Sequence, residues 1–403
     1  VFADLSYTDV VSDAQIAETA SFGVGQYSVN CDNPYLAGSA GTARGQNFTY
    51  YDIYGCTAQD IIDGTIVDGV TVSHRNVEGG PRNSRLENSA FRLVAGLRGD
   101  FADGVWAYEV FGQYSETSDT SISTNDFVIA NLDQALLAVD DGSGNVVCLD
   151  PSGGCVPYNP FQRVGTDTAI TSAQTDFIQG IGIVVGETTQ RVYGANIQGD
   201  LGEYGVSTPW AEDGVALLVG VENRTDKLDS RPDEISQVPG GGFTGVGGAT
   251  LPVAGQVEVM ELYAELQIPL IQDKPFFKEL TLNGQYRYSD YDNSGNNTTN
   301  SFSTDAFGVQ LTWAPVDDIT FRGQFQRAVR APNVIELYTG QNTGLPNLNS
   351  ATNSNGDQIF DPCSTAFPTA SQAACANTGV TAAQYGNVPD VISGQTQSLT
   401  GGN

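Results

Sequence analysis

Long stretches of this chain alternate between apolar and polar residues. Within residues 259–270, every second residue from Met260 to Leu270 is apolar, whereas Glu261 and Glu265 lie between them. Successive side chains of a β-strand point to opposite faces, so this pattern predicts a strand with one apolar and one polar face. The pattern recurs and predicts about ten strands, at residues 1–8, 14–25, 88–101, 105–116, 189–201, 214–226, 256–270, 279–290, 302–314 and 318–330.

The connections between the predicted strands alternate in length. Short ones are residues 9–13, 102–104, 202–213, 271–279 and 314–318; long ones are roughly residues 30–87, 116–189, 227–255, 291–300 and 331–403. Several predicted strands are also long enough to cross a bilayer when tilted. We therefore predict an all-β fold, an antiparallel up-and-down transmembrane β-barrel whose long connections are extracellular loops. A soluble β-sandwich or β-helix would alternate too, but its connections would not segregate by length.

Charge and hydropathy narrow the class further. The chain has 403 residues, 17 Lys and Arg against 47 Asp and Glu, and a formal net charge of −30. Such a chain repels phosphate backbones, so we expect no nucleic-acid partner. No apolar run reaches the length of a spanning helix, which leaves half-apolar strands as a way to cross a membrane. Aromatic residues lie near predicted strand ends, where an interfacial girdle would lie: Phe101, Trp106, Tyr108, Tyr288 and Trp313.

The six cysteines form three pairs that are close in sequence and lie in the predicted long loops. There is no CxxC motif, and the single histidine cannot complete an ordinary zinc site. We predict three disulfides formed in an oxidising compartment, Cys31–Cys56, Cys148–Cys155 and Cys363–Cys375. The alternative is six unpaired thiols of a cytosolic protein.

No catalytic constellation is evident, and we expect no enzyme activity, no metal and no cofactor. Triad chemistry would depend on His74, which lies in an extended segment, and no nucleophile elbow accompanies it. Residues Asp290 and Asp292 begin a sequence similar to a calcium loop, but its twelfth position is Ser301 and not the bidentate glutamate that such a site requires. A polar hairpin tip is the simpler interpretation of this segment.

The segment FRGQFQRAVRAPNVIELY, residues 321–338, resembles the strand-to-loop segment of TonB-dependent outer-membrane receptors. The motif residues that carry the resemblance are Arg330, Ala331, Pro332, Asn333, Glu336 and Leu337. Four further stretches resemble the same family in chain order, namely CDNPYL (31–36), RNVEGGPR (75–82), GCVPYNPF (154–161) and VALLVGVENR (215–224). Because the matches are ordered along most of the chain, we interpret them as a family resemblance and not as chance.

The resemblance implies a 22-stranded barrel, of which this chain, residues 1–403, would supply a middle section. A plug domain, a TonB-contact segment and a final aromatic strand are not found here, so we expect a receptor fragment or a product of loop cleavage. The implied function is active transport of a scarce nutrient across the bacterial outer membrane, with a siderophore, an oligosaccharide or another large solute as ligand. The implied partners are outer-membrane lipid and lipopolysaccharide, the TonB complex through a plug, and the remaining barrel segments.

Charged residues of the polar parity are the candidate lumen-facing or ligand-facing residues: Glu109, Glu222, Glu261, Glu265, Arg287 and Arg322. Arg330, near the upper end of its strand, belongs with them. In a barrel these residues would line the lumen and contact the plug, or contact ligand directly. Two other functions remain open, a passive porin-like barrel and a soluble secreted β-rich binding protein.

Overall fold

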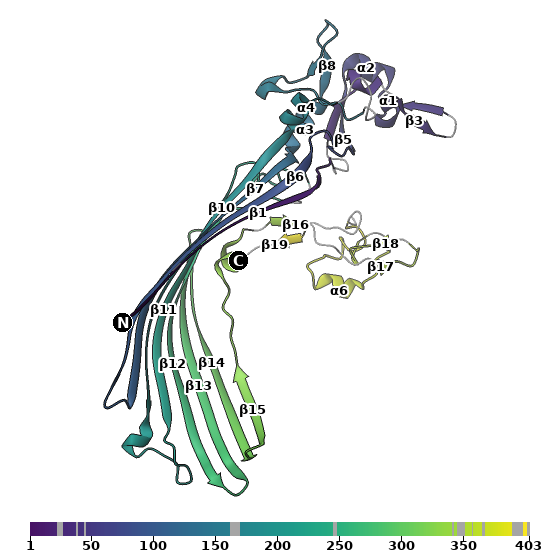
Figure 1. Cartoon of the computed structure of the whole chain (residues 1–403). Helices are drawn as coiled ribbons and strands as arrows, with labels where there is room; N and C mark the ends of the chain where they lie inside the picture. Colours follow the sequence, from purple (N-terminus) through teal and green to yellow (C-terminus); the bar gives the residue numbers. More distant parts are fainter. Residues whose placement is uncertain are drawn as a thin grey trace.

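Nine strands form one continuous antiparallel sheet in the computed structural model (Figure 1). The structure describes residues 1–21, 27–37, 39–43, 46–161, 170–244, 248–340, 342–344, 351–356, 358–364, 367–388 and 398–400. The strands are β1 (Phe2–Glu18), β6 (Pro81–Phe101), β7 (Trp106–Phe127), β10 (Gln179–Asp200), β11 (Ala216–Pro232), β12 (Val253–Lys274), β13 (Phe277–Gly295), β14 (Thr298–Val316) and β15 (Ile319–Arg327). Their order in the sheet is their order in the chain, which confirms the predicted meander.

The strand register carries the alternating pattern unbroken across the sheet. Directly paired residues of antiparallel strands share a face. One row of paired residues is almost wholly apolar: Leu97, Val110, Ala195, Val221, Leu262 and Tyr288. The neighbouring row, on the other side of the sheet, is Arg98, Glu109, Asn196, Gly220, Tyr263 and Arg287. We call these two sides the apolar face and the polar face. Their separation over this many strands is the pattern of a barrel wall between lipid and a wet interior.

The predicted turn at residues 9–13 is wrong, because β1 is a single strand where two had been predicted. It pairs with β6 from Phe2 to Glu18, and Asp13 lies opposite Arg85, with a carboxylate-to-guanidinium distance of 3.8 Å. The long-range ladder satisfies the backbone groups and so overrides the local turn propensity of these residues. The main sheet therefore has nine strands and not ten, and the end of the predicted strand 14–25 lies outside the described residues.

Most strands extend beyond their predicted limits at the end that carries the long connections, but β15 ends at Arg327 and not at residue 330, so Arg330 follows the strand. The first three of these connections are residues 19–80, 128–178 and 233–252, and the second and third are shorter than predicted. The predicted loop 291–300 is wrong: β13 and β14 continue to a two-residue tip, Asn296–Asn297, where both φ angles are positive (46° and 61°). Such φ angles are those of the tight turns whose twist matches a hairpin, and asparagine tolerates them. The polar sequence therefore belongs to two paired strands and not to a loop.

The opposite end of the sheet carries short turns and aromatic side chains. The rings of Phe101 and Trp106 stack across the first turn, and those of Trp313 and Phe321 stack across the last. The indole N–H of Trp313 donates to the backbone carbonyl of Phe276 at 2.9 Å. Aromatic side chains with one polar partner suit the boundary between water and lipid, as the sequence predicted.

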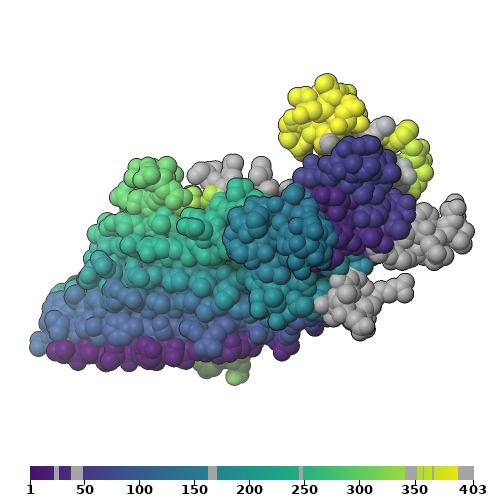
Figure 2. All heavy atoms as spheres, turned by 90° about the horizontal axis from the view of Figure 1, so that it is seen from above, coloured from purple at the N-terminus to yellow at the C-terminus, as the bar shows by residue number. Residues whose placement is uncertain are grey.

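The first and second long connections fold together into one body, which we call the apical cap (Figures 1 and 2). Its elements are β2 (Tyr27–Asn30), η1 (Pro34–Ala37), β3 (Ser39–Ala43), β4 (Gln46–Thr49), α1 (Tyr50–Tyr54), α2 (Ala58–Asp63), β5 (Ile66–Val70), α3 (Ile129–Leu136), β8 (Ala138–Asp140), β9 (Val146–Cys148), η2 (Ser152–Gly154) and α4 (Ser172–Ile178). Both connections contribute to its buried core, which includes Tyr27, Val29, Leu36, Phe127, Leu132, Leu136, Tyr158 and Ile178. The cap is therefore a packed structure and not a pair of independent loops.

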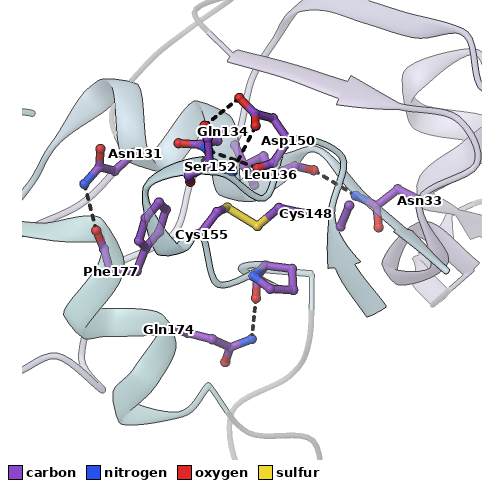
Figure 3. Close-up of a disulfide and its surroundings, with 12 residues drawn as sticks. Asn33, Asn131, Gln134, Leu136, Cys148, Asp150, Ser152, Cys155, Gln174 and Phe177 are labelled. Atoms are coloured by element: carbon purple, nitrogen blue, oxygen red, sulfur yellow. Dashed lines mark hydrogen bonds between the residues drawn. A yellow bond between two sulfur atoms is a disulfide. The ribbon is translucent and has the colours of Figure 1, made fainter. Parts of the chain in front are cut away.

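Buried asparagines and disulfides join the parts of the cap. Asn30 accepts from the backbone N–H of Ala138 at 3.0 Å and donates to its carbonyl at 2.7 Å. Asn33 donates to the carbonyl of Leu136 at 2.8 Å (Figure 3). All three predicted disulfides are present, and two of them, Cys31–Cys56 and Cys148–Cys155, lie in the cap. Cross-links of this kind stabilise loops that cannot bury a large core.

The third connection is fastened to the wall beneath the cap. Its Phe243 packs over Gly180 and Gly182 of β10, where an added Cβ would lie within 2.9 and 3.2 Å of the ring. Thr244 donates its backbone N–H to the carbonyl of Phe127 at 3.0 Å.

The remaining elements of the chain are η3 (Leu201–Tyr204), α5 (Val334–Tyr338), β16 (Asn342–Gly344), β17 (Ala351–Thr352), β18 (Gln358–Ile359), α6 (Gln372–Ala376) and β19 (Ser398–Thr400). Among the described residues, no helix is both long and apolar enough to cross a bilayer.

Candidate ligand-facing surface on the polar face

The register places all six charged residues of the predicted polar parity on the polar face. Three of them are brought together, because Glu222 pairs directly with Glu261, and Arg287 reaches the Glu261 carboxylate from the next strand. The other three lie apart. Glu265 pairs with Gln285 on β13, Glu109 lies on β7, three strands from Glu265 on β12, and Arg322 lies near the short turn at the start of β15.

Glu261 is the buried centre of the charged cluster, with only 4% of its surface exposed. Its carboxylate accepts from the Arg287 guanidinium at 2.8 Å and from the Ser289 hydroxyl at 2.6 Å. The guanidinium of Arg287 also lies 4.9 Å from the ring centroid of Tyr263. Removing one partner from such a pair leaves a buried charge without compensation, which is strongly destabilising. The cluster is therefore a fixed feature of the wall.

A chain of side-chain hydrogen bonds crosses four strands of the polar face, from β6 to β11. Arg92 donates to the Gln113 amide oxygen, Gln113 donates to Gln190 at 2.7 Å, and Gln190 donates to the Asp226 carboxylate at 2.8 Å. All donors point the same way, from a cation to an anion, so each bond polarises the next. Gln113 and Gln190 were not predicted as site residues. The sequence shows that their side chains lie on the polar side of a strand, but not which side chain of another strand they bond.

The family motif forms a compact local structure at the start of α5. Asn333 caps the helix by accepting from the backbone N–H of Glu336 at 2.9 Å, and the Glu336 carboxylate accepts from the backbone N–H of Asn333 at 2.9 Å. Both guanidinium nitrogens of Arg330 donate to the same carboxylate, at 2.9 and 2.7 Å. These bonds lower the pKa of Glu336 to about 2. A capping box closed by a bidentate arginine holds the chain in a fixed turn.

Tyr338 docks the motif onto the polar face. Its ring lies against Gly255 and Gly295, which pair directly across β12 and β13, and an added Cβ at either position would lie within 2.7 Å of the ring. Asn296 donates to the Tyr338 carbonyl at 2.6 Å. Neither glycine was predicted as a site residue. A glycine on the polar side of a strand, near the strand end, could have indicated that another segment approaches the backbone closely there.

A groove of about 610 Å³ lies between the docked motif and the polar face. We call residues 329–335 the motif segment; they form one side of the groove. The other side consists of polar-face residues from five strands, including Thr188, Arg224, Asp226, Glu261, Arg287, Ser289, Tyr291 and Thr304. A second cavity of about 490 Å³, nearer the short turns, is lined by glycines and apolar side chains together with amides such as Gln198, Gln267, Gln285 and Gln324. Concavities of this size are suited to a small solute.

The candidate catalytic histidine and the segment similar to a calcium loop do not form a catalytic or metal site among the described residues. His74 lies in the cap, where its ring nitrogen is 3.2 Å from the Glu78 carboxylate and its ring meets Tyr158 edge to face. Asp290 and Asp292 belong to β13, and an extended strand cannot wrap them around an ion. Within the described ranges, no three His, Cys, Asp or Glu side chains are grouped as metal ligands would be.

The meander, the two-faced register and the segregated loops define the wall of a membrane β-barrel that is open in this chain. The family model described as "TonB dependent receptor-like, beta-barrel" matches residues 21–362, and the chain belongs to this family. This confirms the resemblance stated from the sequence. The family consists of transporters of the bacterial outer membrane and not of enzymes. The search among curated proteins gave no match.

Proposed function

We propose that this chain supplies barrel wall and extracellular loops to a receptor that actively imports a scarce nutrient across the outer membrane. The observation that carries the proposal is the polar face, which runs unbroken across the sheet and holds a groove under the docked family motif. Its ligand would be a siderophore, an oligosaccharide or another large solute. Glu109, Glu222, Glu261, Glu265, Arg287 and Arg322 would line the lumen.

The proposed partners follow from the faces and edges of the sheet. The apolar face would contact lipid and, at the loop end, lipopolysaccharide. Residues 298–306 of β14 pair with β13 on one side, but among the described residues they have no partner strand on the side of β15, which ends at Arg327. An open strand edge is not tolerated in lipid, so further barrel segments of the same receptor would cover β1 and this edge. A plug inside the closed barrel would connect the receptor to the TonB complex.

Uptake in cells tests this proposal. Cells that express the full receptor are given labelled ferric siderophores and labelled oligosaccharides, with and without a protonophore. Active import predicts that accumulation of one label depends both on the receptor and on the proton gradient. Receptor-dependent entry that persists with the protonophore would show a passive porin-like barrel, and recovery of the receptor without detergent would show a soluble secreted protein.

A further inference from the structure

We propose that the connection between β10 and β11 lies among lipid head groups and favours those that carry an ammonium group over anionic ones. We call this connection, residues 201–215, the foot (Figure 1). The inference rests on the proposed contact of the apolar face with lipid, and it extends that contact to a particular connection and a particular head-group chemistry. It follows from three properties of the foot, namely its fixed position, the side of the sheet on which it lies, and its charge.

The foot is fastened to the wall. It has fifteen residues, whereas the turns that precede β7, β13 and β15 have two to four. The Thr208 hydroxyl donates to the Pro269 carbonyl at 2.6 Å. The Gln272 side-chain oxygen accepts from the backbone N–H groups of Glu212 and Asp213 at 2.8 and 2.9 Å. Because Pro269 and Gln272 belong to β12, the foot crosses the end of β11 and is held in one position.

The start of the foot lies on the apolar face. The Trp106 ring lies over its paired residue Gly199, where an added Cβ would be 2.5 Å from the ring, and both residues belong to the apolar face. The indole N–H of Trp106 donates to the Tyr204 hydroxyl at 3.0 Å, so the Tyr204 side chain lies on the same side of the sheet. Tyr204 exposes 59% of its surface. An exposed aromatic ring with a hydroxyl group, beside an apolar surface, suits the boundary between lipid and water.

The second half of the foot continues the aromatic row at the short turns. Trp210 forms a β-bridge with Ile271 of β12. Ile271 pairs with Leu280, and Leu280 pairs with Trp313. Directly paired residues share a face, so Trp210 lies in the row that ends the apolar face at the short turns. Trp210 is 62% exposed, and the foot therefore presents two exposed aromatic side chains on the lipid side of the sheet.

The short-turn end of the sheet is strongly acidic. In residues 100–105, 200–215, 271–279 and 314–318, the acidic residues are Asp100, Asp103, Asp200, Glu203, Glu212, Asp213, Asp273, Glu279, Asp317 and Asp318, and the basic residues are Lys274 and Lys278. The foot itself contains no lysine or arginine. Its Glu203 and Glu212 are exposed and have no salt-bridge partner among the described residues. An ammonium group can pair with these carboxylates and lie over the exposed rings, whereas an anionic head group is repelled.

Photo-crosslinking in a membrane tests the proposal. The full receptor carries p-benzoylphenylalanine in place of Trp210 and is reconstituted into vesicles of equal amounts of phosphatidylethanolamine and phosphatidylglycerol with the same acyl chains. After illumination, mass spectrometry identifies the lipid that is bonded to the probe. The matched control carries the same probe in place of Leu262, which lies on the apolar face of β12.

We expect phosphatidylethanolamine adducts at residue 210 to outnumber phosphatidylglycerol adducts by about twofold or more, as exposed ion pairs allow, and both lipids to react equally at residue 262. Glu203→Gln together with Glu212→Gln should remove the preference. Equal or greater reaction with phosphatidylglycerol at residue 210 would overturn the proposal, as would a preference that persists in the double variant. Lipid adducts at residue 262 but not at residue 210 would overturn the proposal and leave lipid contact of the apolar face intact. Adducts at neither residue would overturn both.

Discussion

The substitution Asn30→Ala tests whether the apical cap is one cooperative structure. Asn30 is fully buried on β2, and its amide bonds both backbone groups of Ala138, which lies 108 residues further along the chain. Ala138 is itself fully buried and begins β8. Removing the amide therefore leaves a backbone N–H without its partner inside a dry core.

The expected cost follows from these two bonds. An unsatisfied buried polar group costs about 1–3 kcal/mol, so leaving both backbone groups of Ala138 unpaired should lower the opening free energy of the cap by about 2–6 kcal/mol. Because 1.4 kcal/mol corresponds to a factor of ten, amide exchange in the cap should then accelerate by about thirtyfold to about ten-thousandfold. The matched control is Ser28→Ala, whose hydroxyl bonds Asp68 in an exposed position and should shift exchange by less than about 0.5 kcal/mol.

Hydrogen exchange read by mass spectrometry is the assay, with peptides from both connections and from β12 and β13. Asn30→Ala should accelerate exchange in both cap connections together and leave the wall peptides unchanged. Faster exchange confined to residues 27–37 would refute the reasoning, because the second connection would then be stable on its own. Unchanged exchange throughout would refute it as well.

Three further predictions concern the wall, the motif and a disulfide. Val219→Arg on the apolar face lies two residues from the aromatic row of Trp106 and should destabilise the folded receptor in lipid by about 1–2 kcal/mol, and its neighbour Leu218→Arg on the polar face less, as measured by urea titration in vesicles. Because the pKa of Glu336 is lowered from 4.5 to about 2, its carboxylate should stabilise the docked motif segment fully above pH 4.5, and this stabilisation should be lost as the pH falls through 2. A spin label at Ile335→Cys would report the release of the motif segment from the polar face. Replacing the Cys31–Cys56 disulfide by serines should cost the cap about 3 kcal/mol, measured by the same exchange assay.

The two-faced wall could be predicted from the sequence because period-two alternation is a local signal. The alternation assigned six charged residues, from Glu109 to Arg322, to one side of their strands, and the strand register places all six on the polar face. The predicted short turns at residues 102–104 and 314–318 are also where β7 and β15 begin. The sequence prediction fails where a partner strand overrides local propensity, as at residues 9–13 of β1 and at the end of the β13–β14 hairpin.

The cap and the groove could not be predicted, because both depend on residues that are distant in sequence. Nothing in the sequence around Asn30 shows that its amide will meet Ala138. Nor does Tyr338 show that it will lie on Gly255 and Gly295, although both glycines are of the polar parity. The cysteine pairs were predictable because each disulfide closes a short loop, and short loops are the commonest way for nearby cysteines to pair.

The motif that reveals the family and the residues that would contact a ligand are different sets. Arg330, Asn333 and Glu336 bond one another, so their polar groups are already satisfied. They place the chain that follows β15 across the polar face, where the sequence alone had predicted only an extracellular loop from residue 331. A motif of this kind shapes one side of a groove, and its shape does not depend on which ligand the groove holds. We propose that selectivity comes instead from the opposite side of the groove, where residues such as Thr304 have no role in the turn.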